Sequence, residues 1–384
     1  MERHSRHGIL VAIGVTVAAL CAACGSSGTT SSPGAGSSAG ASSSPSAVNV
    51  SAAKSELAQY LKVPAHIAQT VALPKAPPKG KTLIYLNQSS VPTTTAIGDA
   101  AEAAAHAAGW NFSEISYDPA NPASLVSAFA TALLKHPTVV GVTGIDPSDY
   151  ASTLANYRKA GVPIVVTSGV PAPITKTVIG LVDDSRADEA AALASWLASD
   201  SGGTGHALLA HVTGFPSLDA IVASFKADIK TLCPHCVINE VDVPVSEAEQ
   251  GQEDGLVVSA LRSNQGDKYL IFDDGDFATG INSALSAASI SGIKIAGFNM
   301  QPSEASALRS GTQAAWTADN NSVTGYDIVD IALRYAEGVA ITTNDQTEPT
   351  QLITPSNVGS ISTWNEPPNA LQQYEKLWKV PLKS

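Results

Sequence analysis

The chain has 384 residues, a formal net charge of −12 at pH 7 and only four cysteines. A net negative charge of this size disfavours binding to nucleic acid. It also supports solubility, but it does not identify a substrate. The low-complexity start is followed by roughly 300 residues, which is more than a domain with one hydrophobic core usually contains. This length indicates two domains.

The start of the chain has the plan of an export signal. Arg3 and Arg6 precede an apolar run, Ile9–Leu20, which is too short to span a bilayer, and two alanines then lead to Cys24. This order resembles a bacterial lipoprotein signal, in which the cysteine after the cleavage site is lipidated. We therefore expect residues 1–23 to be a signal peptide and Cys24 to anchor the protein to the extracytoplasmic face of the cell membrane. The alternative is an ordinary signal peptide that leaves Cys24 unmodified.

The next segment is of low complexity. Residues 24–47 are almost entirely Gly, Ser, Thr, Ala and Pro, which predicts a flexible lipidated tether with an end-to-end distance on the order of 25–30 Å. Residues 48–80 are predicted to be a helical and extended lead-in.

Removal of residues 1–23 takes away two arginines and one glutamate, a net charge of +1, so the mature chain has a charge of −13.

From residue 81 onward, apolar runs alternate with segments of helical periodicity. Each run ends in polar residues, and several are apolar at successive positions, as expected when helices cover both faces of a sheet. The runs are 82–88, 112–118, 138–144, 163–169, 177–184, 206–214, 237–245, 269–276, 294–300 and 313–319. Strands that alternate with helices predict an α/β fold with parallel sheets.

A glycine-rich break at residues 202–205 divides these units into two similar groups. We expect two doubly wound parallel-sheet lobes joined by a hinge, with a cleft between them. The N-terminal lobe is assigned residues 81–184 plus about 320–348. The C-terminal lobe and tail are assigned residues 185–319 plus about 349–384.

Two cysteines, Cys233 and Cys236, enclose Pro-His in the stretch TLCPHCV. Such a pair can be redox-active, metal-binding or structural. Apolar residues run at helical spacing up to Cys233, which places it at a helix C-terminus, where the helix dipole opposes a reactive thiolate. No second Cys/His cluster in the sequence completes a zinc site. In an exported protein these observations favour a disulfide between this helix and the next strand over a catalytic pair.

Ligands of open parallel sheets bind beyond the carboxyl ends of the strands. The polar residues predicted at those ends are Asn87, Gln88, Asp118, Asp146, Ser168, Asp183, Asp274, Asp276, Asn299 and Asp319. Phe215, Phe298 and Trp316 are the aromatic residues near them. Carboxylates and amides bind hydroxyl groups, and an aromatic face covers the C–H side of a pyranose, so the set suits a polyhydroxylated ligand.

Several of these residues have structural roles open to them. Asp276 precedes a predicted helix and is expected to cap it, whereas Asp274 lies two residues earlier and is expected to face the ligand. Asp183 precedes a predicted helix and is as good a cap as a ligand residue, and Asp146, followed by Pro147, reads equally as a turn or a cap. For Trp316, packing in the core is as good an interpretation as stacking on a ligand.

Residues 81 to about 359 resemble a type I periplasmic solute-binding protein of the ribose- and galactose-binding kind, the extracytoplasmic receptor of an ABC importer. The matching stretches are YLNQSS, GIDPSDYASTLANYRKAGVPIVVTSG, FDDGDFATGINSAL and IKIAGFNM. The resemblance implies ligand contacts from Asp274, Asn299 and Asp319.

The chain also departs from that family. Ser168 and Gly169 stand where sugar binders often have an Asp-Arg pair, and Asp219 or a neighbour stands where they often have an arginine. Without those cations the expected pocket is acidic, which keeps an amine-bearing solute open beside a pentose or hexose.

The sequence thus predicts the substrate-binding lipoprotein of an ABC importer, which closes its lobes on a sugar or sugar derivative. The expected ligand-binding residues are Gln88, Asp146, Ser168, Asp183, Phe215, Asp274, Asn299 and Asp319. We expect a monomer that works with a membrane permease, without nucleic acid, metal or cofactor. No nucleophile elbow, zinc-protease motif or phosphate-binding loop in the sequence supports an enzyme. The alternative is a sensor that presents a bound amine, nucleoside or other small signal to a membrane receptor.

Overall fold

The structure is a computed structural model that describes residues 45–89, 91–145, 150–167, 174–182, 186–318, 320–341, 350–361 and 366–382. The predicted signal peptide, Cys24 and most of the predicted tether lie outside this range. In the part of the chain that is described, no helix is long and apolar enough to cross a membrane.

The first of two sheets has, among the described residues, five strands in the order β2-β1-β3-β4-β5, all parallel to their neighbours. They are β1 (Thr82–Gln88), β2 (Asn111–Tyr117), β3 (Val139–Thr143), β4 (Ile164–Thr167) and β5 (Val178–Val182). The faces of this sheet are covered by α2 (Pro92–Ala107), α3 (Pro122–Leu134), α4 (Ala151–Ala160) and α11 (Asn321–Glu337).

Strand β1 shows why these strands are apolar at successive positions. Leu83 and Tyr85 belong to a core with α2 and α11, whereas Ile84 and Leu86 belong to a core with α3 and α4. Because successive side chains of a strand point to opposite faces, a strand covered by helices on both sides needs apolar residues at every position.

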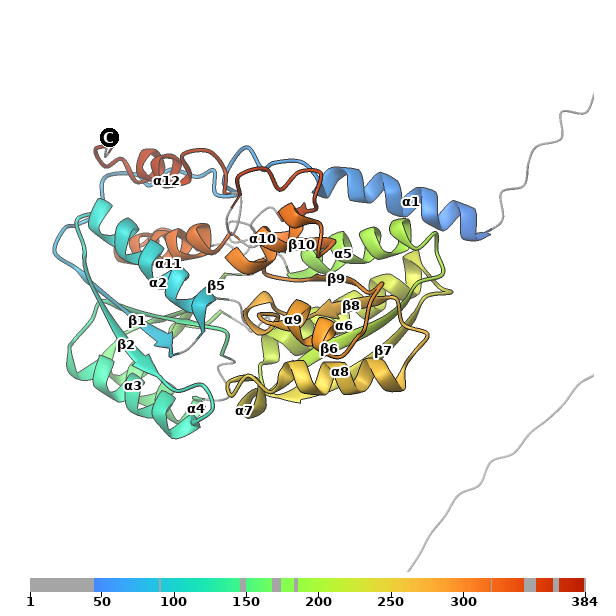
Figure 1. Ribbon diagram of the computed structural model, residues 1–384. Coiled ribbons are helices and arrows are strands. Elements are labelled where there is room, and N and C mark those ends of the chain that lie inside the picture. Colours follow the sequence, from blue (N-terminus) through green and yellow to red (C-terminus); the bar gives the residue numbers. More distant parts are fainter. Residues whose placement is uncertain are drawn as a thin grey trace, which may run out of the picture. The chain divides into compact units, whose positions relative to one another are not determined.

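The second sheet has, within the described residues, six strands in the order β11-β10-β9-β8-β6-β7. They are β6 (His206–Thr213), β7 (Val237–Pro244), β8 (Tyr269–Phe272), β9 (Lys294–Gly297), β10 (Ala315–Ala318) and β11 (Gln351–Ile353), of which β11 alone is antiparallel to its neighbour. On one face lie α1 (Pro45–Tyr60), α5 (Arg186–Asp200) and α6 (Pro216–Leu232). On the other lie α8 (Glu253–Ser263), α9 (Ile281–Ala287) and α10 (Pro302–Ser310). The predicted α/β architecture with two parallel-sheet lobes is confirmed (Figure 1).

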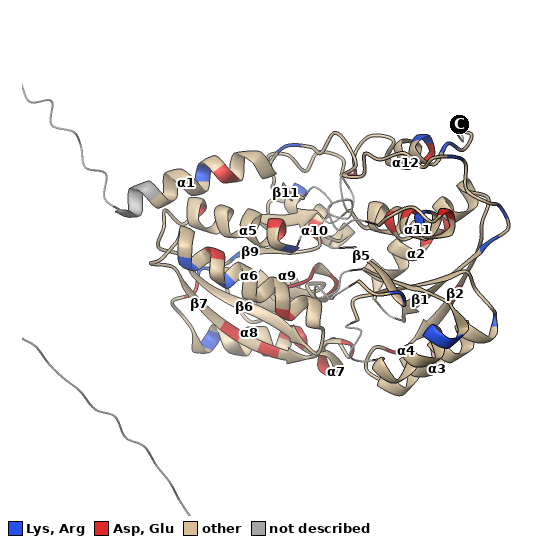
Figure 2. Ribbon diagram, turned by 180° about the vertical axis from the view of Figure 1, so that it is seen from behind, with Lys and Arg blue, Asp and Glu red and all other residues tan. Residues whose placement is uncertain are grey.

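Two short elements follow strands of the second lobe, namely α7 (Val245–Ala248) after β7 and the 3-10 turn η1 (Gly275–Phe277) after β8. Acidic side chains are frequent around the first of these. Figure 2 shows red segments on β7, α7 and α8, where the sequence has Glu240, Asp242, Glu247, Glu253 and Asp254.

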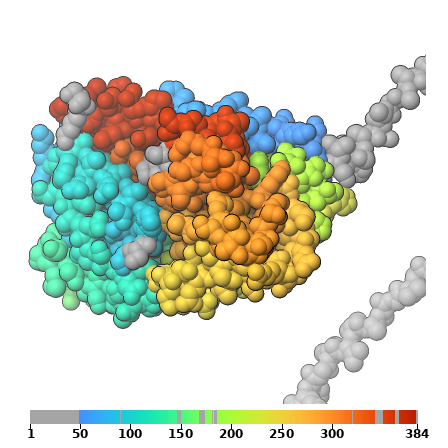
Figure 3. All heavy atoms as spheres, in the orientation of Figure 1, coloured from blue at the N-terminus to red at the C-terminus, as the bar shows by residue number. Residues whose placement is uncertain are grey.

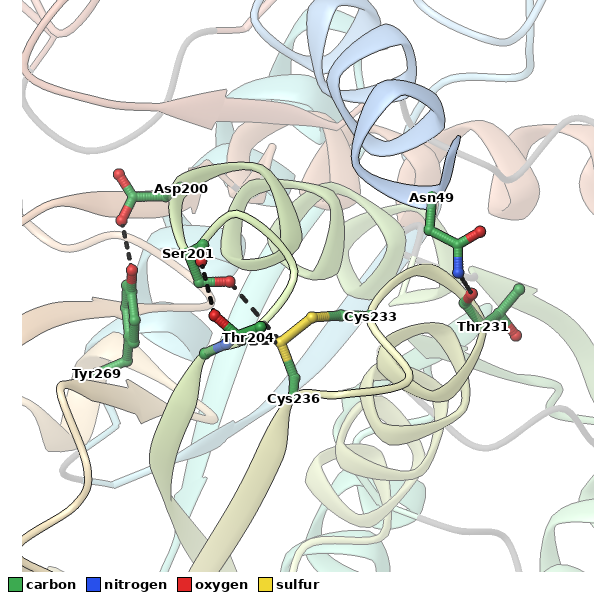
Figure 4. Close-up of a disulfide and its surroundings, with 9 residues drawn as sticks. Asn49, Asp200, Ser201, Thr204, Thr231, Cys233, Cys236 and Tyr269 are labelled. Atoms are coloured by element: carbon green, nitrogen blue, oxygen red, sulfur yellow. Dashed lines mark hydrogen bonds between the residues drawn. A yellow bond between two sulfur atoms is a disulfide. The ribbon is translucent and has the colours of Figure 1, made fainter. Parts of the chain in front are cut away.

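Cys233 and Cys236 form a disulfide in the structure (Figure 4). Cys233 is the C-cap of α6, as expected, and Cys236 directly precedes β7. The sulfur of Cys236 also accepts a hydrogen bond of 3.1 Å from the backbone N–H of Gly205, which directly precedes β6. The disulfide therefore joins the end of α6 to the start of β7, and the hydrogen bond links it to the start of β6, which is a structural position.

The N-terminal helix α1 begins at Pro45, within the segment predicted as tether. Its Ala53 is fully buried in the core of the second lobe, whereas Ile67 and Leu73, a few residues further on, belong to the core of the first lobe. The segment before β1 thus runs from one lobe to the other.

The last helix, α12 (Ala370–Trp378), differs from the expected partition, which assigns residues 349–384 to the second lobe. Strand β11 does extend the second sheet, but α12 packs beside α11 of the first lobe. The Tyr374 hydroxyl donates to Asp327 Oδ1 (2.6 Å) and the Trp378 indole N–H to Asp330 Oδ1 (2.7 Å), so α12 satisfies buried carboxylates of α11. These bonds fix the position of α12 on the first lobe. They join residues nearly 50 positions apart, so no local sequence pattern predicts them.

Candidate ligand-binding site

The carboxyl ends of both sheets border one cavity. From the first lobe it is lined by Gln88, Val91, Thr93, Thr94, Thr143 and Gly144. From α5 and the second lobe it is lined by Arg186, Phe215, Ser217, Leu218, Asp274, Asp276 and Phe277. Its volume is about 40 Å³, which accommodates a few water molecules, whereas ligand sites are roughly ten times larger. The structure is therefore a closed form, and Figure 3 shows atoms of the two lobes meeting on the face drawn.

Gln88, a predicted ligand residue, is the last residue of β1 and forms part of the first-lobe wall. It is 3% exposed, and its Nε2 donates a hydrogen bond of 2.7 Å to the carbonyl of Thr143 on β3. Gly144 has a φ of +71°, and a Cβ there would lie 3.0 Å from Gln88 Nε2. Glycine at 144 therefore supplies both the left-handed turn after β3 and the room for this amide.

Asp274 and Asn299, also predicted, meet in the second lobe. Asn299 Nδ2 donates to Asp274 Oδ1 at 2.9 Å, and Asn299 is fully buried with a φ of +56°. Asparagine tolerates this left-handed conformation better than most residues, which suits the sharp turn after β9. Asp274 lines the cavity, and Asn299 stands behind it and holds its carboxylate.

The expected roles of Asp274 and Asp276 are wrong in one respect. Asp274, not Asp276, is the cap: its Oδ1 accepts from the backbone N–H of Asp276 (2.9 Å) at the start of η1. Asp276 Oδ2 instead accepts from the backbone N–H of Thr93 in the first lobe (3.3 Å). The reason is that β8 is followed by a 3-10 turn that begins at Gly275, whereas the helix starts only at Ile281.

The aromatic wall differs from the expected one. Phe215 lines the cavity and stacks with Phe277, their ring centroids being 6.1 Å apart. Phe298 and Trp316 are fully buried in the two cores of the second lobe and do not line the cavity. Two phenylalanines of one lobe therefore supply the apolar face that a sugar ring would need.

Arg186, which the sequence analysis missed, adds a cation to a site expected to have none. It is the first residue of α5, its side chain is 12% exposed, and it lines the cavity. Its Nη1 lies 4.0 Å from Glu189 Oε2. The cavity thus combines one guanidinium with the carboxylates of Asp274 and Asp276, so its charge is mixed rather than purely acidic.

His211 lies between two carboxylates, and one of them, Asp273, directly precedes Asp274 in the chain. His211 Nδ1 is 2.7 Å from Asp273 Oδ2 and its Nε2 is 2.9 Å from Asp219 Oδ1. Burial by itself lowers the pKa of His211, but the hydrogen bonds to Asp273 and Asp219 and their charges outweigh it, so the pKa is raised. Burial raises the pKa of Asp273, which is 0% exposed and also accepts from the Val212 N–H. His211 is therefore a structural residue that fixes the carboxylate next to Asp274.

Four predicted ligand residues lie outside the described residues. They are Asp146, Ser168, Asp183 and Asp319. Their roles stay predictions, as does the lipidation of Cys24. Among the residues that are described, no group of three or more His, Cys, Asp or Glu side chains is placed to hold a metal ion.

Three of the cavity residues that the sequence analysis missed share one position. Thr93, Arg186 and Ser217 lie in the first turns of α2, α5 and α6, just beyond the strand ends. A proline at the start of a helix is a usable signal, because Pro92 and Pro216 mark where two of these helices begin. The first helical turn after each strand should therefore be searched along with the strand end itself.

Comparisons with known proteins agree with this geometry. A model of the periplasmic binding protein domain matches residues 84–340. No curated protein matches the chain. Among solved structures, an ABC sugar transporter subunit from Rhodobacter sphaeroides 2.4.1 is 18% identical with a TM-score of 0.63, covering 73% of this chain and 99% of its own.

Two further structures have the same fold. A 5-methylthioribose transporter solute-binding protein from Thermotoga lettingae is 16% identical with a TM-score of 0.66, covering 80% of this chain and 99% of its own. A solute-binding protein from Mycobacterium smegmatis, with bound glycerol, is 18% identical with a TM-score of 0.64, covering 75% and 100%. The family model spans well over half of the chain. The chain therefore belongs to the periplasmic binding protein family, whose members bind solutes and are not enzymes.

Proposed function

We propose that this protein is an extracytoplasmic substrate-binding lipoprotein of an ABC importer, and that it binds a sugar or sugar derivative as a monomer. The observation that supports this most is the cavity between the carboxyl ends of the two sheets, lined by polar side chains of both lobes and by two phenylalanines. The Rhodobacter and Thermotoga structures with this fold are described as a sugar and a 5-methylthioribose transporter component.

The chemistry of the wall suits hydroxyl groups. The amide of Gln88 and the carboxylate of Asp274 offer donors and acceptors from opposite lobes, and Arg186 offers further donors. Phe215 and Phe277 offer an apolar face on one side. A ring with hydroxyl groups on its rim and C–H groups on its faces matches both features. The mixed charge also admits a sugar derivative with an amino or acidic substituent.

Binding is proposed to proceed by closure of the lobes. Since the cavity holds only a few waters, the ligand has to enter when the lobes are apart, and the occupied form has to enclose a larger cavity than this one. Contacts from both lobes make the occupied closed form the stable one. The membrane permease would recognise that form, and lipidation at Cys24 would keep the protein beside it.

The test of this proposal is a thermal-shift screen of the purified protein. The panel is D-ribose, D-galactose, D-xylose, 5-methylthioribose, glycerol, adenosine and spermidine, which separates sugars from polyols, nucleosides and amines. A ligand present at 100 times its Kd adds roughly 2.7 kcal/mol to the free energy of unfolding. We expect a clear rise of the melting temperature with at least one sugar. A flat response to all seven compounds would count against the proposal.

A further inference from the structure

Helix α2 of the first lobe starts without a capping side chain of its own. Its N-cap residue is Val91, in an extended conformation, followed by Pro92 at the first helical position. The first N–H groups of a helix have no partner within the helix, and a side-chain oxygen of the N-cap residue usually accepts one of them. A valine side chain has no oxygen to offer.

The missing acceptor comes from the other lobe. Asp276 Oδ2 accepts from the backbone N–H of Thr93, the second residue of α2, at 3.3 Å. This is one of the amides that an N-cap side chain normally binds, and a carboxylate is also favoured there by the helix dipole. Asp276 therefore occupies the position of an N-cap residue, although it lies 183 residues further along the chain.

Thr93 is also bound through its side chain. Its Oγ1 accepts from Asn299 Nδ2 at 2.6 Å and from Gln301 Nε2 at 3.1 Å, and both of these residues are buried in the second lobe. The start of α2 thus makes three hydrogen bonds to the second lobe. None of them can persist when the lobes move apart.

The second lobe holds Asp276 ready for this contact. A Cβ at Gly275 would lie 2.3 Å from the carbonyl oxygen of Asn299, so only glycine allows η1 to lie so close to the turn after β9. The backbone N–H of Gly275 donates to the carbonyl of Phe298 (2.8 Å), and that of Asp276 donates to Asp274 Oδ1 (2.9 Å). The backbone of Asp276 is therefore fixed by residues in and directly behind the wall of the ligand cavity.

We propose that Asp276 is a positioning residue that caps α2 across the cleft, and that this contact helps to set the ratio of closed to open protein. The proposal rests on the proposed function, since closure matters because it traps the ligand. Loss of a capping side chain lowers helix stability by an amount equivalent to about a 2- to 30-fold change in an equilibrium constant. Here the cap exists only in the closed form. Its loss should therefore lower the ratio of closed to open protein by the same factor.

The experiment compares the full-length, ligand-free wild-type protein with four variants. Asp276→Ala removes the cap, and Asp276→Asn keeps a side chain that caps nearly as well. Val91→Ser supplies a cap within the first lobe, and it is combined with Asp276→Ala in a double variant. Asp242→Ala removes an exposed carboxylate of the second lobe and is the control. Hydrogen exchange of the peptide that contains Thr93, and the radius of gyration from X-ray scattering, are measured for each.

We expect Asp276→Ala to exchange faster at Thr93 and to have a larger radius of gyration, whereas Asp276→Asn and Asp242→Ala behave like the wild type. The double variant should regain slow exchange, because the introduced serine caps α2 locally, but it should stay open. Unchanged exchange or an unchanged radius in Asp276→Ala would overturn the proposal. So would a double variant that closes again. Because no ligand is present, these results are independent of the thermal-shift screen.

Discussion

Asp274 stabilises one wall of the ligand cavity through two hydrogen bonds. Its Oδ1 accepts both the Asn299 amide and the backbone N–H of Asp276, each at 2.9 Å. The residue is 7% exposed and faces the cavity. A ligand that reaches it therefore meets a carboxylate whose position is already set, which lowers the entropy cost of binding.

Substitution of Asp274 should affect both binding and stability. Asp274→Ala should weaken binding of the best sugar from the screen by roughly 10- to 150-fold, because a hydrogen bond to a charged group is lost. It should also lower the free energy of unfolding by about 0.5–2 kcal/mol, because η1 loses its cap. Asp274→Asn should keep most of the stability, since asparagine caps as well. Calorimetry and urea unfolding check this, and an Asp274→Ala variant with wild-type affinity would contradict it.

The raised pKa of His211 leads to a pH dependence. A folded-state pKa above the unfolded value of about 6.5 means that the stabilisation is fully present below pH 6.5 and is lost as the pH rises through the folded-state pKa. The wild type should therefore lose stability between pH 6.5 and higher pH, and His211→Gln should lose less over the same range. Urea unfolding at a series of pH values from below to above this point checks the expectation. Parallel pH profiles of the two proteins would rule out His211 as the source.

At the residue scale, the sequence locates the cavity but not all of its contacts. Gln88, Phe215 and Asp274 could be predicted because they end or directly follow apolar runs. Arg186 and Thr93 could not be predicted, because the conformation of the preceding loop decides whether the first turn of a helix faces the cavity. The sequence could not show that the capping role falls to Asp274 rather than Asp276, because apolar patterns place element boundaries only to within about two residues.

At the element scale, the strands are predictable and the final helix is not. Each of the ten predicted runs overlaps one of the strands β1 to β10. Inner strands such as β3 and β8 are buried at every position, which leaves an unbroken apolar stretch, whereas the edge strands β2 and β7 are only partly buried. Helix α12 is amphipathic, but periodicity shows only that one face is buried, not which core buries it. The buried carboxylates of Asp327 and Asp330 on α11 decide this through Tyr374 and Trp378.

Helix α12 should therefore contribute to the stability of the first lobe. Tyr374→Phe removes a buried hydroxyl that donates to Asp327 at 2.6 Å, and we expect a loss of about 1.5–3 kcal/mol in the free energy of unfolding. Lys376→Ala, an exposed change on the same helix, should cost less than about 0.5 kcal/mol. Urea unfolding of both variants decides the point. Equal stabilities would show that α12 does not depend on this bond.

At the scale of the whole molecule, two lobes with separate cores share one small cavity. The first lobe contributes Gln88 and the second contributes Phe215 and Asp274, so a ligand bound there touches both. The hydrogen bonds between Thr93 and the second lobe add direct contacts between the lobes beside those that a ligand would make. Ligand binding then has to shift an equilibrium between open and closed forms. The measured affinity for the ligand therefore includes the free energy of lobe closure.

The central claim is that one small solute is held by both lobes at once. It is tested by calorimetric titration of the sugar that gives the largest thermal shift into the wild type, Gln88→Ala and Phe215→Ala. Glu102→Ala, an exposed change on α2, is the control. Loss of a buried polar or aromatic contact should weaken binding about 10-fold or more in each of the first two variants, one from each lobe, and not in the control. Wild-type affinity in either variant would contradict a site shared between the lobes.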